Sequence, residues 1–286
     1  MPIETWVVIA IYLGFGVIEF FRSDLFSKPE QCRNDGIIEV VSTTLLLIVT
    51  QPLIIAAVNW LGLRYFPEYQ GALGGIGILL ALPLFLIFED MLQYWWHRAS
   101  HSVSFLYNLH RAHHNARYMS VRLVYRNNII YYALMPSIWC AAVLIYLGLG
   151  WFYAGYLIVK LLVITGAHSD VKWDEPLYRV PWLSPLMWVV ERTISTPATH
   201  HAHHGRHAHD SAVHYKGNYG NLMFIWDMIF GTAKITRTYP QSYGVENLPD
   251  ATLGQQLLWP IFPENRDIDR RIDGASPKAA PSGNMA

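Results

Sequence analysis

The chain has 286 residues, of which 52% are hydrophobic and only 15% are charged. Soluble domains usually carry about a quarter of charged residues, so this composition is that of a membrane protein. The 21 basic residues balance the 21 acidic ones, which leaves no basic field for binding nucleic acid. Cys32 and Cys140 lie far apart and support neither a disulfide framework nor a cysteine-bound iron–sulfur cluster. Electrons for any redox reaction would therefore come from another protein.

Five apolar runs predict membrane helices. In chain order they are Trp6 to Phe21, Ile38 to Leu61, Leu73 to Phe88, Ile129 to Leu149 and Trp151 to Gly166. Glu19 and Lys160 interrupt the first and the last run, and we expect both at the membrane interface, with a position facing the bundle as the alternative for Lys160. The predicted fold is an all-α membrane bundle of four or five spans, with a cytoplasmic helical cap built from residues 97–127 and 168–260.

Basic residues are distributed unevenly among the loops. They gather after the first run, after the third and after Gly166, whereas the loop after the second run has only Arg64. The positive-inside rule therefore predicts that the N-terminus lies outside and that all 13 histidines lie in the cytoplasm. Segment 168–188, rich in proline and tryptophan, is expected to lie along the headgroups. Residues 1–270 are predicted to form one domain, and the small, polar segment 271–286 is predicted to be disordered.

Histidines recur at spacings of three and four residues, and the pattern HxxHH occurs twice. On a helix such residues project from one face, and a neutral imidazole is a ligand suited to zinc, copper, nickel or iron. A further histidine stands at the end of the last apolar run. The predicted ligands are His97, His101, His110, His113, His114, His168, His200, His203 and His204. Because nine imidazoles exceed what one ion needs, the sequence predicts a two-metal site.

Imidazole ligands alone do not identify the reaction. Histidines beneath an apolar bundle suit a reactant whose acyl or alkyl chain lies in the bilayer, and unactivated C–H bonds need an oxidant such as activated oxygen. Two iron ions are therefore the expected metals. Zinc could occupy the same ligands without performing that chemistry.

The ordered motifs resemble those of the fatty acid hydroxylase and sterol desaturase superfamily. The run D-x-x-x-Y-W-x-H-R-x-x-H begins at Asp90 and ends at His101, and it is followed by HRAHH, by AHS at 167–169, by HxxHH and by NYGNLMFIWDMIFGT. The resemblance covers roughly residues 70–235. The later loop SYGV, at 242–245, is similar to the branch of this family that contains alkylglycerol monooxygenase.

This resemblance implies a non-haem di-iron membrane oxidase that uses O2 and an external electron donor to hydroxylate or desaturate a lipid. A reductase or a small electron-transfer protein would be its partner. The nine histidines match the metal-binding positions of the family one by one, and His201 could replace or supplement His200. His207, His209 and His214 are further histidines nearby, for which we expect no ligand role.

Several residues near the first histidine motif (His97 and His101) and after the third (the third box, His200 to His204) are predicted to support the ligands. The resemblance implies that Asn218, Tyr219, Trp226 and Asp227 brace the third box, and that Asp90 fixes an imidazole tautomer. The role of Glu89 stays open between such support and marking the exit of the helix into water. Tyr94, Trp95 and Trp96 either form an interfacial aromatic belt or line a substrate pocket.

Other functions compete with the lipid hydroxylase. A divalent-metal transporter or sensor should place ligands near the middle of the spans, and few ionisable residues lie there. A membrane zinc hydrolase should use three ligands, an open position and a carboxylate base, and nine histidines argue against it. Within the oxidase interpretation, lipid or sterol desaturation and pterin-dependent cleavage of ether lipids are the alternatives.

Overall fold

Helices make up the regular structure of the computed structural model, which describes residues 3–23, 25–26, 28, 30–248 and 251–262. The α-helices are α1 (Ile3–Ser23), α2 (Asp35–Thr44), α3 (Gln51–Tyr65), α4 (Ile78–Phe85), α5 (Leu92–Ser100), α6 (Ser104–His114), α7 (Ile129–Ala133), α8 (Pro136–Leu144), α9 (Gly150–His168), α10 (Glu175–Tyr178), α11 (Ser184–Thr193), α12 (Pro197–His204), α13 (Ile225–Phe230) and α14 (Leu253–Leu258). The π-helices are η1 (Leu45–Thr50), η3 (Leu86–Met91) and η5 (Ile145–Leu149), and the 3₁₀ turns are η2 (Pro67–Tyr69), η4 (Val121–Leu123) and η6 (Pro181–Leu183). The predicted all-α fold is therefore confirmed. Segment 271–286 lies outside the described residues, and the single-domain prediction stays a prediction.

Three helical stretches in the described part of the chain are long and apolar enough to cross a membrane. They are Asp35–Tyr65, Ile78–Ser100 and Pro136–His168. The first and second contain Pro52 and Pro83, and each also contains a π-helical turn, η1 just before Pro52 and η3 just after Pro83. A proline lacks the N–H of the regular helical ladder and crowds the carbonyl one turn earlier. The wider turn η1 lies at that place before Pro52, whereas η3 follows Pro83.

The third stretch turns back on itself at Gly148. This residue has φ of +103°, and a Cβ there would lie 2.9 Å from the backbone nitrogen of Gly74. Glycine is therefore required for the turn that joins η5 to α9. The predicted helix from Ile129 to Leu149 is wrong at its start, because α7 ends at Ala133 and a new helix begins at Pro136. Because it turns back at Gly148, this one stretch contains most of the fourth predicted run and all of the fifth, so the three candidate stretches correspond to four of the five predicted runs.

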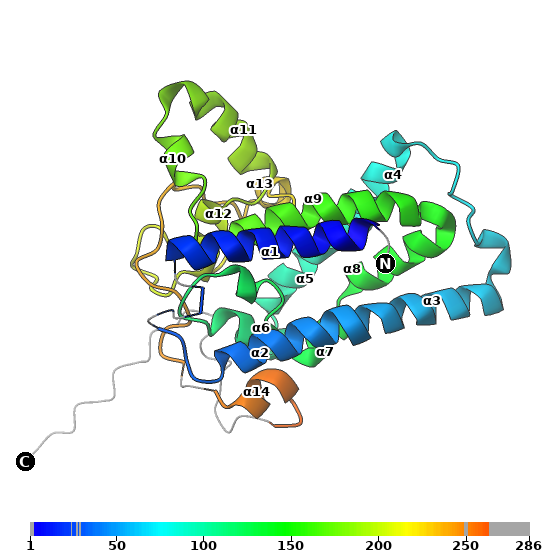
Figure 1. Cartoon of the computed structure of the whole chain (residues 1–286), viewed down its shortest axis with the longest axis horizontal. Coiled ribbons are helices and arrows are strands. Elements are labelled where there is room, and N and C mark those ends of the chain that lie inside the picture. The colour runs from blue at the N-terminus through cyan, green and yellow to red at the C-terminus, as the bar shows by residue number, and fades with distance from the viewer. Residues whose placement is uncertain (1–2, 24, 27, 29, 249–250, 263–286) are drawn as a thin grey trace, which may run out of the picture.

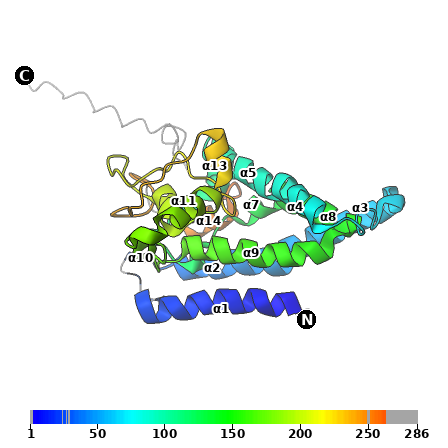
Figure 2. The same ribbon diagram turned by 90° about the horizontal axis from the view of Figure 1, so that it is seen from above.

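The long helices run lengthwise, and the cap gathers at one end of them (Figures 1 and 2). Helix α1 lies beside α9, while α2 and α3 run along the other side of the molecule in Figure 1. An apolar core between α4, η5 and α9 includes Phe85, Leu149 and Phe152. The start of α1 lies at the end opposite the cap (Figure 1), which is the relative placement expected of an outer N-terminus and a cytoplasmic cap. The orientation itself stays a prediction.

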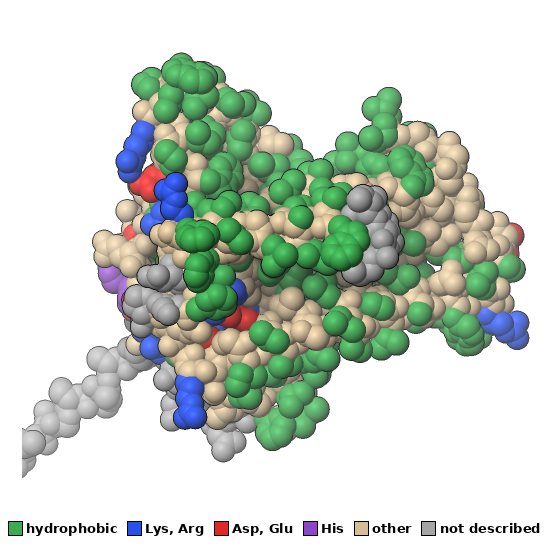
Figure 3. Space-filling view, viewed as in Figure 1, with side chains coloured by type: hydrophobic (Ala, Val, Ile, Leu, Met, Phe, Trp, Pro, Cys, Tyr) green, Lys and Arg blue, Asp and Glu red, His purple; other side chains and the backbone are tan. Residues whose placement is uncertain are grey.

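Segment 168–188 forms α10, η6 and the start of α11, which project from the cap (Figure 3). Trp182, Leu186 and Trp188 are exposed on this projection, and Arg192 lies over the ring of Trp188, 4.3 Å from its centroid. Exposed tryptophans beside arginine are typical of a surface at the level of the headgroups. Contact of this segment with the membrane remains a prediction.

Neither ionisable residue of the apolar runs lies at an exposed interface. Glu19 has no exposed surface and Lys160 is 6% exposed. Lys160 forms an ion pair with Glu89, which also accepts a hydrogen bond of 2.7 Å from the hydroxyl of Tyr156. A charge inside an apolar bundle needs such a partner. Both side chains are therefore buried within the protein, and Lys160 faces the bundle, whereas the level of each residue in the membrane stays a prediction.

Candidate metal centre

The nine predicted histidines converge in two groups, although they come from four helices. The first group is His97, His101, His110, His114 and His203, and the second is His113, His168, His200 and His204. Within each group, one nitrogen of every ring lies within 4.8 Å of one nitrogen of every other. The rings of His114 and His204 stack with their centroids 4.4 Å apart, so the two groups adjoin.

Local sequence explains why each histidine set points one way. The pairs at three and four residues in α5, α6 and α12 lie on one face of each helix. Helix α12 begins with a capping box in which the side chains of Thr196 and Thr199 each bond the backbone of the other, and Pro197 occupies its first turn. These signals fix the start of a short helix whose last turns carry His200, His203 and His204.

Backbone carbonyls orient four of the nine rings. The Nδ1 atoms of His97, His113, His168 and His203 lie 2.7–3.0 Å from the carbonyl oxygens of Tyr219, Leu123, Ile164 and Gly217, respectively. A carbonyl oxygen only accepts, so each Nδ1 must carry the proton and donate it. Each neutral ring then presents the lone pair of Nε2 to its group, as metal-binding histidines with an outer hydrogen bond do.

A shared cation accounts for two close contacts between these rings. The Nε2 atoms of His97 and His203 lie 3.0 Å apart, and those of His113 and His168 lie 3.4 Å apart. Because both Nδ1 atoms of each pair are donors, both facing nitrogens of a neutral pair are acceptors. Lone pairs that face each other at this distance repel, and an ion bound by both nitrogens removes the repulsion.

The spacing of the nitrogens also fits a metal. Nitrogens bound about 2.0–2.1 Å from one ion are separated by about 2.9 Å at neighbouring octahedral positions and about 3.4 Å in a tetrahedron. Three further Nε2–Nε2 distances are 3.2 Å for His110 and His114, 2.9 Å for His168 and His200, and 3.2 Å for His200 and His204. All five distances therefore lie in the range that shared coordination produces.

Burial keeps the rings of the cap neutral. It lowers the pKa of His113, His203 and His204 well below the usual value, because a charged imidazole loses its hydration, and the neighbouring histidines lower it further. Neutral imidazoles are the form that binds metal. The residues present therefore fit two metal ions in donor type, protonation and spacing.

The other histidines lie outside both groups. His201 contacts the hydroxyl of Tyr243 at Nδ1 and the carbonyl of Ser169 at Nε2, each at 3.0 Å. Both of its nitrogens are thus engaged away from the groups, so we do not assign it a ligand role. His207 and His209 stack on each other at a partly exposed surface, and His214 contacts the carbonyl of Thr232.

Asp227 builds the turn that supports the first group. This carboxylate has no exposed surface, and it accepts hydrogen bonds from the backbone N–H of Tyr219, the backbone N–H of Gly220 and the hydroxyl of Thr232. The same turn supplies the Tyr219 carbonyl that holds His97. A Cβ at Gly220 would lie 2.8 Å from the carboxylate, so glycine permits this close approach.

Asn218 completes the turn and joins it to α12. Its φ of +55° is the left-handed conformation that asparagine tolerates. The side-chain amide donates to the carbonyls of Thr199 and Lys234, and its oxygen accepts from the backbone N–H of Lys234. The turn thus contacts α12 through Asn218, and it supports His97 through Tyr219 and Asp227. That these residues brace the third histidine motif stays a prediction.

Asp90 and Tyr94 contact this turn region and not the imidazoles. Asp90 accepts from the indole N–H of Trp226 at 2.7 Å and from the backbone N–H of Met223 at 3.3 Å. The expectation that Asp90 fixes an imidazole tautomer is therefore wrong, and backbone carbonyls perform that role. Asp90 lies near the end of the π-helical turn η3, about two helical turns before His97, and its carboxylate is directed to the segment before α13. Tyr94 bonds Thr232 and stacks on Phe230.

An open cavity of about 380 Å³ lies between α1 and α9. Its lining is almost wholly apolar and comprises Phe15, Ile18, Leu162, Val163, Gly166, Val171, Trp173, Ile194 and Ser195. Gly166 and His168 are two residues apart on α9, so they point to nearly opposite sides of the helix. A chain bound in this cavity would be separated from the metal groups by α9.

Comparison with known proteins identifies the family. A family model described as Fatty acid hydroxylase matches residues 82–232, which is more than half of the chain and includes all nine histidines. The chain belongs to the fatty acid hydroxylase family. The histidine motifs on which the predicted resemblance rests all lie within the matched region.

Three curated relatives are alkylglycerol monooxygenases. The protein of Homo sapiens is 30% identical over 155 residues, that of Danio rerio 28% over 150 residues, and that of Xenopus tropicalis 27% over 150 residues. In each case the match covers 50% of this fatty acid hydroxylase family member and 28% of the relative. No solved structure matches the chain with significance. The predicted likeness to the branch of alkylglycerol monooxygenase is thus confirmed.

Proposed function

We propose that the protein is an O2-dependent oxidase that holds two iron ions and hydroxylates a C–H bond of a membrane lipid. The observation that carries this proposal is the convergence of nine imidazoles, eight of them buried, in two adjoining groups whose Nε2 atoms face one another. The first group would hold one ion and the second group the other. Membership in the fatty acid hydroxylase family supports iron as the metal.

The residues of the chain orient the imidazole ligands and limit the access of water to the site. Iron bound by these histidines would supply the activation of O2 and the oxidation of an unactivated C–H bond. The carbonyls of Tyr219, Gly217, Leu123 and Ile164 keep the proton on Nδ1 and the lone pair on Nε2. Eight of the nine rings are buried and His101 is partly buried, which limits the access of bulk water to the reaction.

The reaction needs an outside source of electrons. In hydroxylation one atom of O2 enters the lipid C–H bond, the other leaves as water, and two electrons and two protons are consumed. Cys32 and Cys140 lie far apart in the sequence and form no pair that could hold a cysteine-ligated cluster to supply the electrons. We therefore propose a reductase or small electron-transfer protein as the partner.

The reaction class and the location are parts of the proposal. The relatives named alkylglycerol monooxygenase make an ether lipid the second candidate substrate, with a pterin as the alternative reductant. Desaturation of a lipid or sterol would begin with the same hydrogen abstraction. We propose that the active site faces the cytoplasm, in keeping with the distribution of basic residues.

Labelled oxygen distinguishes these reactions. The purified protein, loaded with Fe²⁺ without air, would receive a total lipid extract, a chemical reductant and ¹⁸O2, and the products would be examined by mass spectrometry. We expect a lipid product that carries one ¹⁸O atom, or an aldehyde and a glycerol if an ether lipid is cleaved. Loss of two hydrogens without ¹⁸O would show a desaturase. No lipid change, with O2 consumption equal to that of a His168→Ala, His200→Ala variant, would contradict an oxidase.

A further inference from the structure

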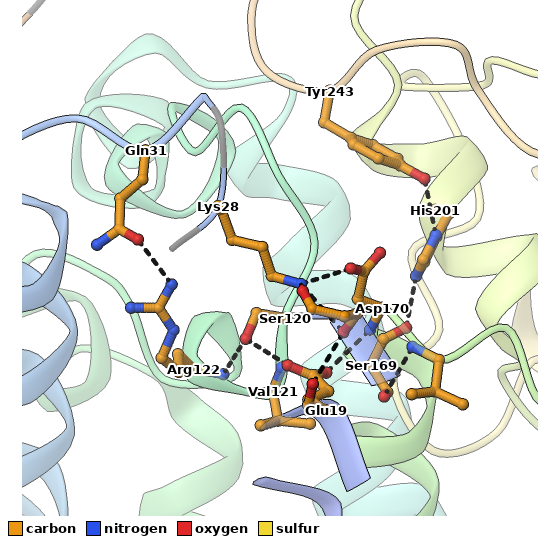
Figure 4. Close-up of polar contacts among 12 residues, drawn as sticks. Glu19, Lys28, Gln31, Ser120, Val121, Arg122, Ser169, Asp170, His201 and Tyr243 are labelled. Carbon is orange, nitrogen blue, oxygen red and sulfur yellow. Dashed lines mark hydrogen bonds and ion pairs between the residues drawn. The ribbon is translucent and has the colours of Figure 1, made fainter. Parts of the chain in front are cut away.

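Glu19, near the end of α1, is a buried carboxylate with three donors around it. Its oxygens accept from the hydroxyl of Ser120 at 2.7 Å, the backbone N–H of Val121 at 3.0 Å and the backbone N–H of Asp170 at 2.9 Å (Figure 4). The side chain has no exposed surface. A carboxylate buried at this depth needs such donors, and they come from two segments far apart in the sequence.

The first segment leads to a support of the second metal group. Ser120 and Val121 begin η4, which ends at Leu123. The carbonyl of Leu123 accepts the hydrogen bond of His113. A shift of this short turn would therefore rotate the His113 ring.

The second segment adjoins two other histidines of the same group. Asp170 lies two residues after His168, and between them the carbonyl of Ser169 contacts Nε2 of His201, the neighbour of His200 (Figure 4). The backbone bond from Asp170 to Glu19 thus fixes the chain where it leaves α9. This bond therefore restrains His168, two residues earlier in the chain, and it restrains α12 through the contact between Ser169 and His201.

Further bonds hold α1 against these segments. Lys28 donates to the carboxylate of Asp170 and to the carbonyl of Ser23 at the end of α1. The hydroxyl of Tyr12 donates to the carbonyl of Val121 at 2.8 Å. In contrast, the carbonyls that orient the first group belong to Tyr219 and Gly217, in the turn before α13.

We propose that Glu19 is a positioning residue for the second metal ion. It joins η4 to the segment after α9, and so it sets the orientation of His113 and His168 without touching the metal. This inference rests on the proposed two-metal centre. It also assigns α1 a role beyond membrane anchoring, because this helix carries a residue that orients the ligands of one metal site.

Two substitutions distinguish the effect of the hydrogen bonds of Glu19 from the effect of the space that its side chain fills. Glu19→Leu removes the acceptor and leaves three buried donors unpaired. Glu19→Gln keeps one oxygen acceptor for the two backbone N–H groups, while its amide can donate to the hydroxyl of Ser120. We expect Glu19→Leu to weaken metal binding by the second group about 10–100-fold, as loss of an outer partner does, and Glu19→Gln to restore most of it.

The test measures Zn²⁺ bound per chain in two backgrounds. In a His97→Ala, His203→Ala background the second group alone should hold about one ion, and Glu19→Leu should remove it at a Zn²⁺ concentration that fills the parent. In a His168→Ala, His200→Ala background the first group alone should keep its ion with Glu19→Leu present. Size-exclusion chromatography and circular dichroism would check that each variant is folded.

Other outcomes overturn the proposal. Equal loss in both backgrounds would give Glu19 a general structural role, and no loss in either would remove its role altogether. If Glu19→Leu does not fold, Ser120→Ala, which removes one donor, should lower binding by the second group alone, and equal binding to its parent would refute the inference. A wild-type protein with fewer than two sites would instead contradict the proposed function.

Discussion

Replacing Asp227 with alanine should lower the metal affinity of the first group about 10–100-fold, the effect typical of losing an outer-shell partner. The substitution leaves three donors without an acceptor in a buried turn, namely the N–H groups of Tyr219 and Gly220 and the hydroxyl of Thr232. Each unpaired group costs about 1–3 kcal/mol. The turn should relax, and the Tyr219 carbonyl should then lose its hold on His97.

Zn²⁺ titration of the Asp227→Ala variant in the His168→Ala, His200→Ala background would measure this loss for the first group alone. Asp210→Ala is the matched control, because Asp210 also accepts from two backbone N–H groups but lies in a partly exposed loop away from both groups. It should change affinity less than about twofold. Equal affinities of the Asp227→Ala and Asp210→Ala variants would contradict the proposed support of His97.

Replacing Lys160 alone with methionine should destabilise the protein by about 3–5 kcal/mol, because it leaves the Glu89 charge buried without its cation. Both side chains are 8% exposed. The double variant Glu89→Leu, Lys160→Met should recover most of that loss, since no unpaired charge remains. Glu89 and Lys160 each lie eight residues before a metal-group histidine, His97 and His168, so the single variant should also reduce bound metal.

Thermal unfolding in detergent, with Zn²⁺ content measured on the same samples, would test both effects. The exposed ion pair of Arg179 and Glu175 provides the control, and Arg179→Met should cost less than about 1 kcal/mol. A double variant as unstable as Lys160→Met would show that the lost stability comes from packing, and would refute the account based on charge.

The nine metal-group histidines could be predicted from sequence because the signal is local. Spacings of three and four residues place imidazoles on one face of a helix whatever the tertiary structure. The pattern could not show how the sets divide, since His113 and His114 are neighbours in sequence but belong to different groups. That division depends on how α6 packs between α5, α9 and α12.

Long-range partners were the part that sequence could not supply. The carbonyls that orient His97 and His203 lie 122 and 14 residues away in the chain, and any residue type can offer a carbonyl. Glu19 was expected at an interface because a charge near the end of an apolar run usually lies there, yet its donors lie more than 100 residues away.

The most direct test of the two-metal centre is the metal content of the purified protein by mass spectrometry, alongside a His113→Ala, His203→Ala variant that removes one ligand from each group. His209→Asn is the matched control, since His209 lies at an exposed position outside both groups. We expect about two irons per chain in the wild type and the control, and a large loss in the double variant. Fewer than one metal per chain, unchanged in the double variant, would contradict the centre.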